Sequence, residues 1–273
     1  AEDPKFPTLR LANMLQLQHH MSVDLYVEEI IEKAKIVIVR VLGGRNYWSY
    51  GIDEIVAACS KYSIPVGFIP GDDQPDIELA NLSSIKGDPL HKIWQFQLHG
   101  GAENARHMLC FAAHLIGFES IWQEPKPLVR TGLYWPRRVA PDITFFHSNW
   151  DKSAPIVGIL FYRALIQAGN TEVIDKLIYA LRKLGLNPLP IFTQSLRDPV
   201  AAGILEMNFS IHPPEIIINA TGFSISTPGS NREVSVFEIG RDSSAPMVMQ
   251  MVFSSESEKC WREKTNGLPV RDI

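Results

Sequence analysis

Residues 35–73 read KIVIVRVLGGRNYWSYGIDEIVAACSKYSIPVGFIPGDD, and this stretch decides the fold of the chain. Its β-branched run at 36–41 predicts a buried strand, and the apolar run at 64–69 predicts a second strand. Between them, the spacing of apolar side chains over 52–62 indicates an amphipathic helix. Strand, loop, helix and strand in this order form the repeating unit of a parallel α/β sheet.

The loop between the first strand and the helix, residues 43–51, carries more chemistry than a connecting turn needs. It begins with two glycines and contains Arg45 together with Tyr47, Trp48 and Tyr50. Open α/β sheets bind ligands at the carboxyl ends of their strands. Aromatic rings could stack on a flat ligand there, and the guanidinium could pair with a carboxylate. The alternative is that Trp48 and Tyr50 pack into the core, as most large aromatic side chains do.

A pair of carboxylates, Asp72 and Asp73, follows the second strand. They could bind a cation or an amine of a ligand. They could equally cap a helix that begins near Asp76, because aspartate accepts hydrogen bonds from first-turn N–H groups and favours the positive end of a helix. Consecutive side chains need not converge, so a metal site with two carboxylates does not follow. The sequence leaves the binding and capping roles open.

A helix predicted from residue 102 places a carboxylate, two imidazoles and a thiol on one face. Glu103, His107, Cys110 and His114 follow one another at intervals of four, three and four residues. Neighbouring pairs of these side chains could bind a borderline divalent ion such as Co²⁺. The alternative is a partly buried polar face without a metal, because no recognised metal-binding spacing is present.

Composition divides the chain into a first α/β block (1–125), a linker region (126–153) and a second α/β block (154–273). The linker region is rich in Pro and Trp and shows little periodicity. In the second block, apolar runs without alternation are typical of a parallel sheet covered by helices on both faces. We therefore predict the α/β class, with two Rossmann-like blocks whose sheets are mainly parallel. A polar segment at 224–244 predicts a long loop, which is either functional or mobile.

Two further candidates, Tyr162 and Arg163, lie at the end of the strand predicted for 155–162. A Thr-Gly-Phe sequence at 221–223 ends a later predicted strand. These groups could line one ligand cleft with Arg45 if the two sheets face each other. Alternatively, Arg163 pairs with a nearby carboxylate and has a structural role.

The bulk composition narrows the class of function. A formal net charge of -4 does not favour a nucleic-acid surface. Three cysteines without a CxxC motif fit the reducing cytosol, so we expect a cytoplasmic protein. The start of the chain lacks the pattern of a signal peptide, and the apolar run at 154–162 is too short to cross a bilayer, so we expect no membrane association. No P-loop motif is present, so ATP binding of that kind is not encoded here.

Several motifs resemble one family over nearly the whole chain, in order and at consistent spacing. They are SVDLYVEE (22–29), VRVLGGRNYWSYG (39–51), PGDDQPDIELA (70–80), GLYWP (132–136), FYRALIQAGNT (161–171), LNPLPIFTQSLRDP (186–199), NATGF (219–223) and GLPVRDI (267–273). This pattern resembles the large subunits of aerobic cobaltochelatase and of the related magnesium chelatase. The SVDLYV and GDDQPD motifs favour the cobalt enzyme.

The resemblance implies the N-terminal part of the large, tetrapyrrole-binding subunit of an ATP-dependent cobaltochelatase, a ligase of aerobic cobalamin biosynthesis. The whole enzyme would insert Co²⁺ into hydrogenobyrinic acid a,c-diamide. ATP and Mg²⁺ would be used by two smaller partner subunits of AAA+ type. The corrinoid face would stack on the aromatic side chains of loop 43–51, and this part alone would be inactive.

Three alternatives stay open. The first is the large subunit of magnesium chelatase, which would place Mg²⁺ in protoporphyrin IX. The second is a docking module that recruits the ATPase motor subunits and does not contact the ring. The third sets the resemblance aside and describes a two-domain α/β protein that binds a small anionic ligand in a cleft.

Overall fold

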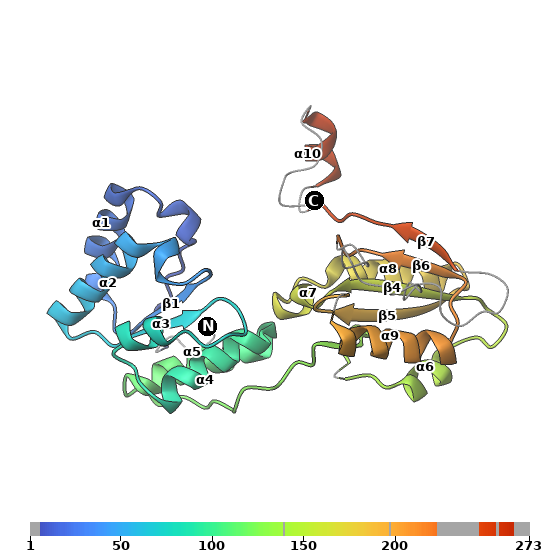
Figure 1. The fold of residues 1–273 in the computed structure, drawn as a ribbon, viewed down its shortest axis with the longest axis horizontal. Helices are drawn as coiled ribbons and strands as arrows, with labels where there is room; N and C mark the ends of the chain where they lie inside the picture. The colour runs from blue at the N-terminus through green and yellow to red at the C-terminus, as the bar shows by residue number, and fades with distance from the viewer. Residues whose placement is uncertain (1–5, 139, 197, 223–245, 255–256, 265–273) are drawn as a thin grey trace. The chain divides into compact units, whose positions relative to one another are not determined.

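The structure, a computed structural model, describes residues 6–138, 140–196, 198–222, 246–254 and 257–264. Its contacts divide the chain into two compact units, Ala1–Leu128 and Val129–Ile273 (Figure 1). Each unit has a hydrophobic core of its own.

The first unit is built around two parallel strands. β1 (Val37–Val41) pairs with β2 (Val66–Pro70) so that Val37 lies opposite Val66 and Val41 opposite Pro70. The helical elements of this unit are η1 (Met14–Gln16), α1 (His20–Glu29), η2 (Ile31–Lys33), η3 (Arg45–Tyr47), α2 (Ser49–Tyr62), α3 (Ile77–Leu82), α4 (Asp88–His99) and α5 (Gly101–Leu115).

Helices cover both faces of this sheet. Successive side chains of a strand point to opposite faces, so each strand contributes to the core on either side. Val39 and Phe68 pack in one core with the apolar side chains of α1 and α2. Ile69 packs in a second core with α4 and α5, which contribute Ile93 and Phe111. Gly87 and Gly100 lie at the breaks before α4 and before α5, with φ values of 63° and 64° that glycine adopts readily.

The second unit contains a mixed sheet. Within the described residues the strand order is β3-β5-β4-β6-β7, with β3 antiparallel to β5 and the other pairs parallel. Figure 1 labels β4 to β7 of this sheet. The strands are β3 (Thr131–Leu133), β4 (Ile156–Tyr162), β5 (Asn187–Thr193), β6 (Ile216–Asn219) and β7 (Met247–Gln250). The helices are α6 (Ile143–Asn149), α7 (Arg163–Gln167), α8 (Glu172–Lys183), α9 (Pro199–Ile211) and α10 (Glu258–Glu263).

The predicted α/β class, with mainly parallel sheets covered by helices, is confirmed. Some details differ from the sequence-based expectation. α2 begins inside the aromatic loop, and the stretch 126–153 contains the helix α6 in addition to β3, which matches the short strand that residues 131–134 predict. The expected loop at 224–244 and the family-like motif at 267–273 lie outside the described residues.

β5 contains two prolines, Pro188 and Pro190, although proline is rare in central strands. β3 pairs only with the last part of β5, where Leu133 lies opposite Ile191. Both prolines lie before the residues of β5 that are in register with β3, although the N–H of Tyr134 still donates to the carbonyl of Pro190 at 3.0 Å.

In the portion of the chain that the structure describes, no helix is long and apolar enough to cross a membrane.

Candidate functional site

The carboxyl ends of β1 and β2 lie next to each other, as expected for a parallel pair. The N–H of Gly71 donates to the carbonyl of Val41 at 2.7 Å. Gly43 and Gly44 have φ values of 89° and 72°, which few other residues adopt, so the chain turns sharply after β1. As a result, the aromatic loop and the Asp72–Asp73 pair begin at the same edge of the sheet. We refer to this region as the β1–β2 edge.

Arg45 is held at the β1–β2 edge by two carboxylates. Its Nη2 lies 2.8 Å from Asp53 Oδ1, and its Nη1 lies 3.3 Å from Glu78 Oε1. The hydrogen bonds to Asp53 and then to Glu78 raise the pKa of Arg45 further above its usual value. The arginine side chain is 37% exposed, and exposed ion pairs are weak in water. A ligand carboxylate can therefore compete for this guanidinium.

The three aromatic side chains of this loop differ in their surroundings. Trp48 packs against the core of the first unit, and its indole Nε1 donates to the carbonyl of Leu17 at 2.8 Å. Tyr50 stacks on His20 with ring centroids 3.8 Å apart. Tyr47 is 61% exposed, so its ring is accessible to a ligand.

Tyr50 is also fixed through its hydroxyl group. The hydroxyl donates to Asp24 Oδ1 at 2.6 Å. This hydrogen bond, with a smaller contribution from desolvation, raises the pKa of Tyr50 to about 12. Tyr50 therefore connects α2 to α1 through its ring and its hydroxyl, and the packing role considered from the sequence describes Trp48 and Tyr50 well.

Asp76, rather than Asp72 or Asp73, caps α3. Its Oδ1 accepts a hydrogen bond from the N–H of Leu79 at 2.9 Å. Asp72 Oδ1 accepts from the N–H of Gln74 at 3.1 Å, and Asp73 Oδ1 accepts from Gln74 Nε2 at 3.3 Å. The capping alternative for the pair is therefore wrong, because both carboxylates lie ahead of the turn that precedes the helix.

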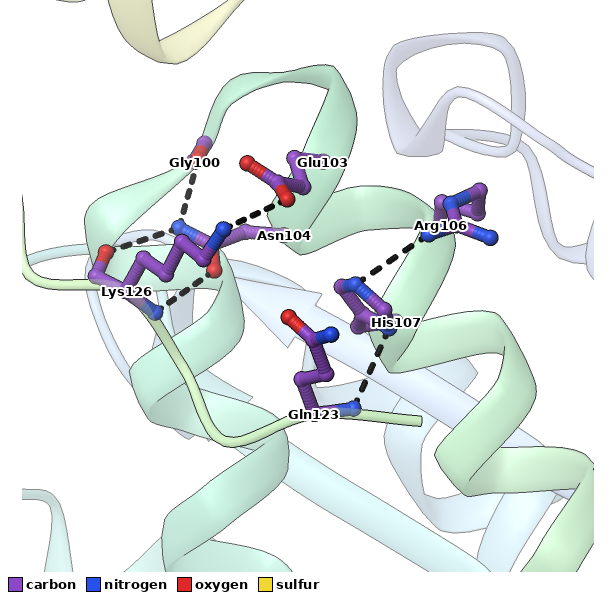
Figure 2. A network of polar contacts seen from close by, with 7 residues as sticks. All are labelled: Gly100, Glu103, Asn104, Arg106, His107, Gln123 and Lys126. Atoms are coloured by element: carbon purple, nitrogen blue, oxygen red, sulfur yellow. Dashed lines mark hydrogen bonds and ion pairs between the residues drawn. The ribbon is translucent and has the colours of Figure 1, made fainter. Parts of the chain in front are cut away.

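The polar face of α5 binds the segment that follows it in the chain. Figure 2 shows Glu103 paired with Lys126 Nζ at 2.6 Å and His107 Nδ1 accepting from the N–H of Gln123 at 3.1 Å. The hydrogen bond from Lys126 lowers the pKa of Glu103. His107 is 2% exposed, and its Nε2 lies 3.3 Å from Arg106.

Asn104 is the centre of this network (Figure 2). Its Nδ2 donates to the carbonyls of Gly100 at 2.8 Å and Lys126 at 3.0 Å, and its Oδ1 accepts from the N–H of Lys126 at 2.9 Å. Sequence reasoning missed Asn104 and Lys126, because no local pattern pairs residues this far apart. An amide on the same helix face as His107 was the one available signal.

The remaining members of the predicted metal set have other neighbours. The carbonyl of Cys110 accepts from Ser120 Oγ at 2.6 Å, and the ring of His114 lies 6.1 Å from that of Trp122. Among the described residues, no group of three or more His, Cys, Asp or Glu side chains could hold a metal ion. Glu103 and His107 bind the segment around 120–126 through their side chains, and a metal ion held by a pair of residues on this face stays a prediction.

In the second unit, Tyr162 and Arg163 mark the junction of β4 and α7. The hydroxyl of Tyr162 accepts from the N–H of Gly222 at 2.7 Å. Arg163 is 7% exposed, and its Nε donates to the carbonyl of Val129 at 3.0 Å. Both side chains thus join strand ends to neighbouring loops of this unit.

Comparison with known proteins gives the family. The family model described as CobN/Magnesium Chelatase matches residues 94–273. The chain therefore belongs to the CobN/magnesium chelatase family.

Two similar relatives carry the same name. The chain is 36% identical over 278 residues to a Sinorhizobium protein named aerobic cobaltochelatase subunit CobN, covering 97% of this chain and 21% of the relative. It is 36% identical over 269 residues to the Pseudomonas aeruginosa protein of that name, covering 98% of this chain and 21% of the relative. The chain thus spans about a fifth of the length of these relatives.

A solved structure agrees with the fold. The catalytic subunit of cobaltochelatase from Mycobacterium tuberculosis matches with a TM-score of 0.58 and 24% identity, over 91% of this chain and 20% of that chain. At this identity the match supports the α/β architecture described above.

Proposed function

We propose that this chain is part of the large subunit of an ATP-dependent cobaltochelatase and helps to hold the corrinoid substrate. The observation that carries the proposal is the 36% identity over 97% of the chain to a protein named aerobic cobaltochelatase subunit CobN. The substrate of the whole enzyme would be hydrogenobyrinic acid a,c-diamide, with Co²⁺ as the inserted metal. ATP and Mg²⁺ would be used by two smaller partner subunits of AAA+ type in the cytoplasm.

Metal insertion needs a macrocycle held still while Co²⁺ loses water and the ring nitrogens lose protons. The β1–β2 edge offers groups that suit the holding step. The exposed ring of Tyr47 can stack on the apolar face of the corrinoid. Arg45 can exchange one of its two carboxylate partners for a carboxylate at the edge of the ring. Asp72 and Asp73 can accept hydrogen bonds from peripheral amides.

The test is a titration of hydrogenobyrinic acid a,c-diamide into the chain, followed by tryptophan fluorescence. Saturable quenching is expected, because Trp48 lies in the same loop as Tyr47. Tyr47→Ala and Arg45→Ala should weaken binding. Tyr179→Ala is the matched control, because Tyr179 is 64% exposed on α8 and should leave binding unchanged. Protoporphyrin IX in place of the corrinoid tests the magnesium alternative, and stronger binding of the porphyrin would favour it.

A docking role for the motor subunits is the second candidate. It is favoured by the intramolecular contacts of Trp48 and Tyr50, which leave fewer aromatic faces for a ring than the sequence indicated. This role predicts that the chain captures purified AAA+ subunits and that the corrinoid does not quench its fluorescence at any soluble concentration. Quenching that Tyr47→Ala abolishes would exclude a purely docking role.

A further inference from the structure

The two carboxylate partners of Arg45 at the β1–β2 edge differ in how firmly they bind it. Asp53, on α2, accepts from Nη2 at 2.8 Å, a usual length for a charge-assisted hydrogen bond. Glu78, on α3, accepts from Nη1 at 3.3 Å, which is longer than usual. The pKa of Arg45 follows the same order, because the hydrogen bond to Asp53 raises it more than the bond to Glu78 does. The contact with Glu78 is therefore the weaker of the two.

The inner side of the Arg45 guanidinium is closed to a ligand. Within the residues that the structure describes, its Nε is buried and has no hydrogen-bond partner. Since Nε is out of reach, an incoming carboxylate must bind at the two Nη atoms. Asp53 and Glu78 contact these same atoms, so a ligand carboxylate that binds both Nη atoms competes directly with them.

Glu78 can leave Arg45 at little cost. Its side chain is 56% exposed, so the released carboxylate returns to water. It also lies in the first turn of α3, where the free N–H groups favour negative charge. A glutamate has one more rotatable bond than an aspartate, so holding it against Arg45 costs more side-chain entropy.

Asp53 is placed more firmly. Its neighbours on α2, Ile52 and Ile55, are 0% and 3% exposed and anchor this turn of the helix in the core of the first unit. Arg45 itself begins the three-residue helix η3 directly after a glycine. The short, strong bond to Asp53 therefore fixes the direction in which the guanidinium projects.

We propose that Asp53 is the positioning residue of Arg45 and that Glu78 is an internal competitor, which a ligand carboxylate displaces. This role rests on the proposed holding function of the β1–β2 edge. Because Glu78 already occupies part of the guanidinium, a small carboxylate gains little by replacing it. A ligand needs a second contact, and the exposed ring of Tyr47 offers one to a flat apolar surface. The edge thus selects flat rings with a peripheral carboxylate over small carboxylates.

The first test is a fluorescence titration of hydrogenobyrinic acid a,c-diamide into the full chain and its variants. Glu78→Gln should strengthen binding by about two- to fivefold, the range that loss of one exposed ion pair allows. Asp53→Ala should weaken binding toward the level of Arg45→Ala, because the guanidinium loses its direction. Glu54→Gln is the matched control, since Glu54 is the next residue of α2 and the ion pairs of Arg45 within the described residues are with Asp53 and Glu78. Its affinity should equal that of the unmodified chain.

The Arg45→Ala background separates displacement from a general effect of charge. In that background Glu78→Gln should no longer strengthen binding, because the competitor has no guanidinium to release. The same gain in both backgrounds would mean that Glu78 acts through its charge alone, and the competitor role would be wrong.

A measurement without ligand tests the positioning role even where the corrinoid does not bind and the proposed function fails. Nitrogen NMR of the guanidinium groups reports how freely each one rotates, and Arg45→Ala identifies the Arg45 signal. Rotation should be restricted in the unmodified chain and in Glu78→Gln, and free in Asp53→Ala. Free rotation in Glu78→Gln, or restricted rotation in Asp53→Ala, would overturn the proposal whatever the corrinoid does.

Discussion

Gly51 is the residue that sets the position of Trp48 at the β1–β2 edge. A Cβ atom at this position would lie 2.2 Å from Cε2 and Cζ2 of the Trp48 indole. The ring therefore fills the space that any other residue at 51 would need. The indole can take this position, and donate to the carbonyl of Leu17, only because residue 51 has no side chain.

Gly51→Ala should destabilise the first unit by about 1–3 kcal/mol, because overpacking displaces a ring that is part of its core. Urea denaturation followed by tryptophan fluorescence measures this loss. The matched control is Gly203→Ala in α9, where no atom lies within 4 Å of the added Cβ. That substitution should stabilise by about 0.5–1 kcal/mol, as expected for glycine replaced in a helix interior. An unchanged midpoint for Gly51→Ala would show that the indole moves aside freely.

At the residue scale, the sequence predicts which residues belong to the candidate site better than it predicts which residues they contact. Loop chemistry after a strand was enough to single out Arg45, but its pairing with Asp53 and Glu78 depends on how α2 and α3 are placed. The contacts of Asn104 with Lys126 join residues without a common pattern. Tertiary contacts of this kind have no periodic signature, so they became visible only in the structure.

At the element scale, apolar runs and helical periodicity predicted most of the strands and the longer helices. α6 was missed because it spans only Ile143–Asn149, too few residues to show a periodic pattern. Its one clear signal was Asp142, which accepts from the N–H of Phe145 and the hydroxyl of Thr144. α7 was missed for the same reason, since it covers Arg163–Gln167 directly after a strand.

The start of α9 shows how one side chain supports an element. Asp198 Oδ1 accepts from the N–H of Val200 at 3.0 Å, and Pro199 occupies the first helical position, where its missing N–H costs nothing. Asp198→Ala should destabilise the second unit by about 0.5–2 kcal/mol, because the first-turn N–H loses its acceptor. Chemical denaturation followed by circular dichroism measures this.

Asp198→Asn distinguishes the stability that comes from the helix cap from the stability that comes from the negative charge. Asparagine caps helices about as well as aspartate, so this variant should retain most of the stability. Asp198 also lies 3.9 Å from Arg130 Nη1, and an ion pair this long contributes little. If asparagine and alanine caused equal losses, the ion pair rather than the cap would be the stabilising contact.

At the scale of the whole molecule, each of the two units contains what an independently folding domain requires. The first unit buries side chains on both faces of β1 and β2, and the second buries them around β4, β5 and β6. Residues 126 and 128, at the end of the first unit, bond to earlier residues of that unit. The N–H of Lys126 donates to Asn104 Oδ1, and the N–H of Leu128 donates to His99 Nδ1 at 3.3 Å. The sequence placed the end of the first block at 125, before these contacts.

The first unit expressed as residues 1–128 should therefore fold alone and unfold cooperatively in urea. A chain cut after residue 125 removes the backbone groups of Lys126 that satisfy Asn104, a side chain that is 5% exposed. The Nδ2 of Asn104 keeps its bond to the carbonyl of Gly100, but its buried Oδ1 loses the N–H of Lys126. A buried polar atom without its partner costs about 1–3 kcal/mol, so the shorter chain should be less stable by about that amount. Asn104→Ala in the longer chain should lose less stability than the truncation does, because it removes the polar group along with its bonds.

Equal stability of the 1–125 and 1–128 chains would mean that water replaces Lys126. A disordered 1–128 chain would mean that the first unit needs the rest of the protein to fold.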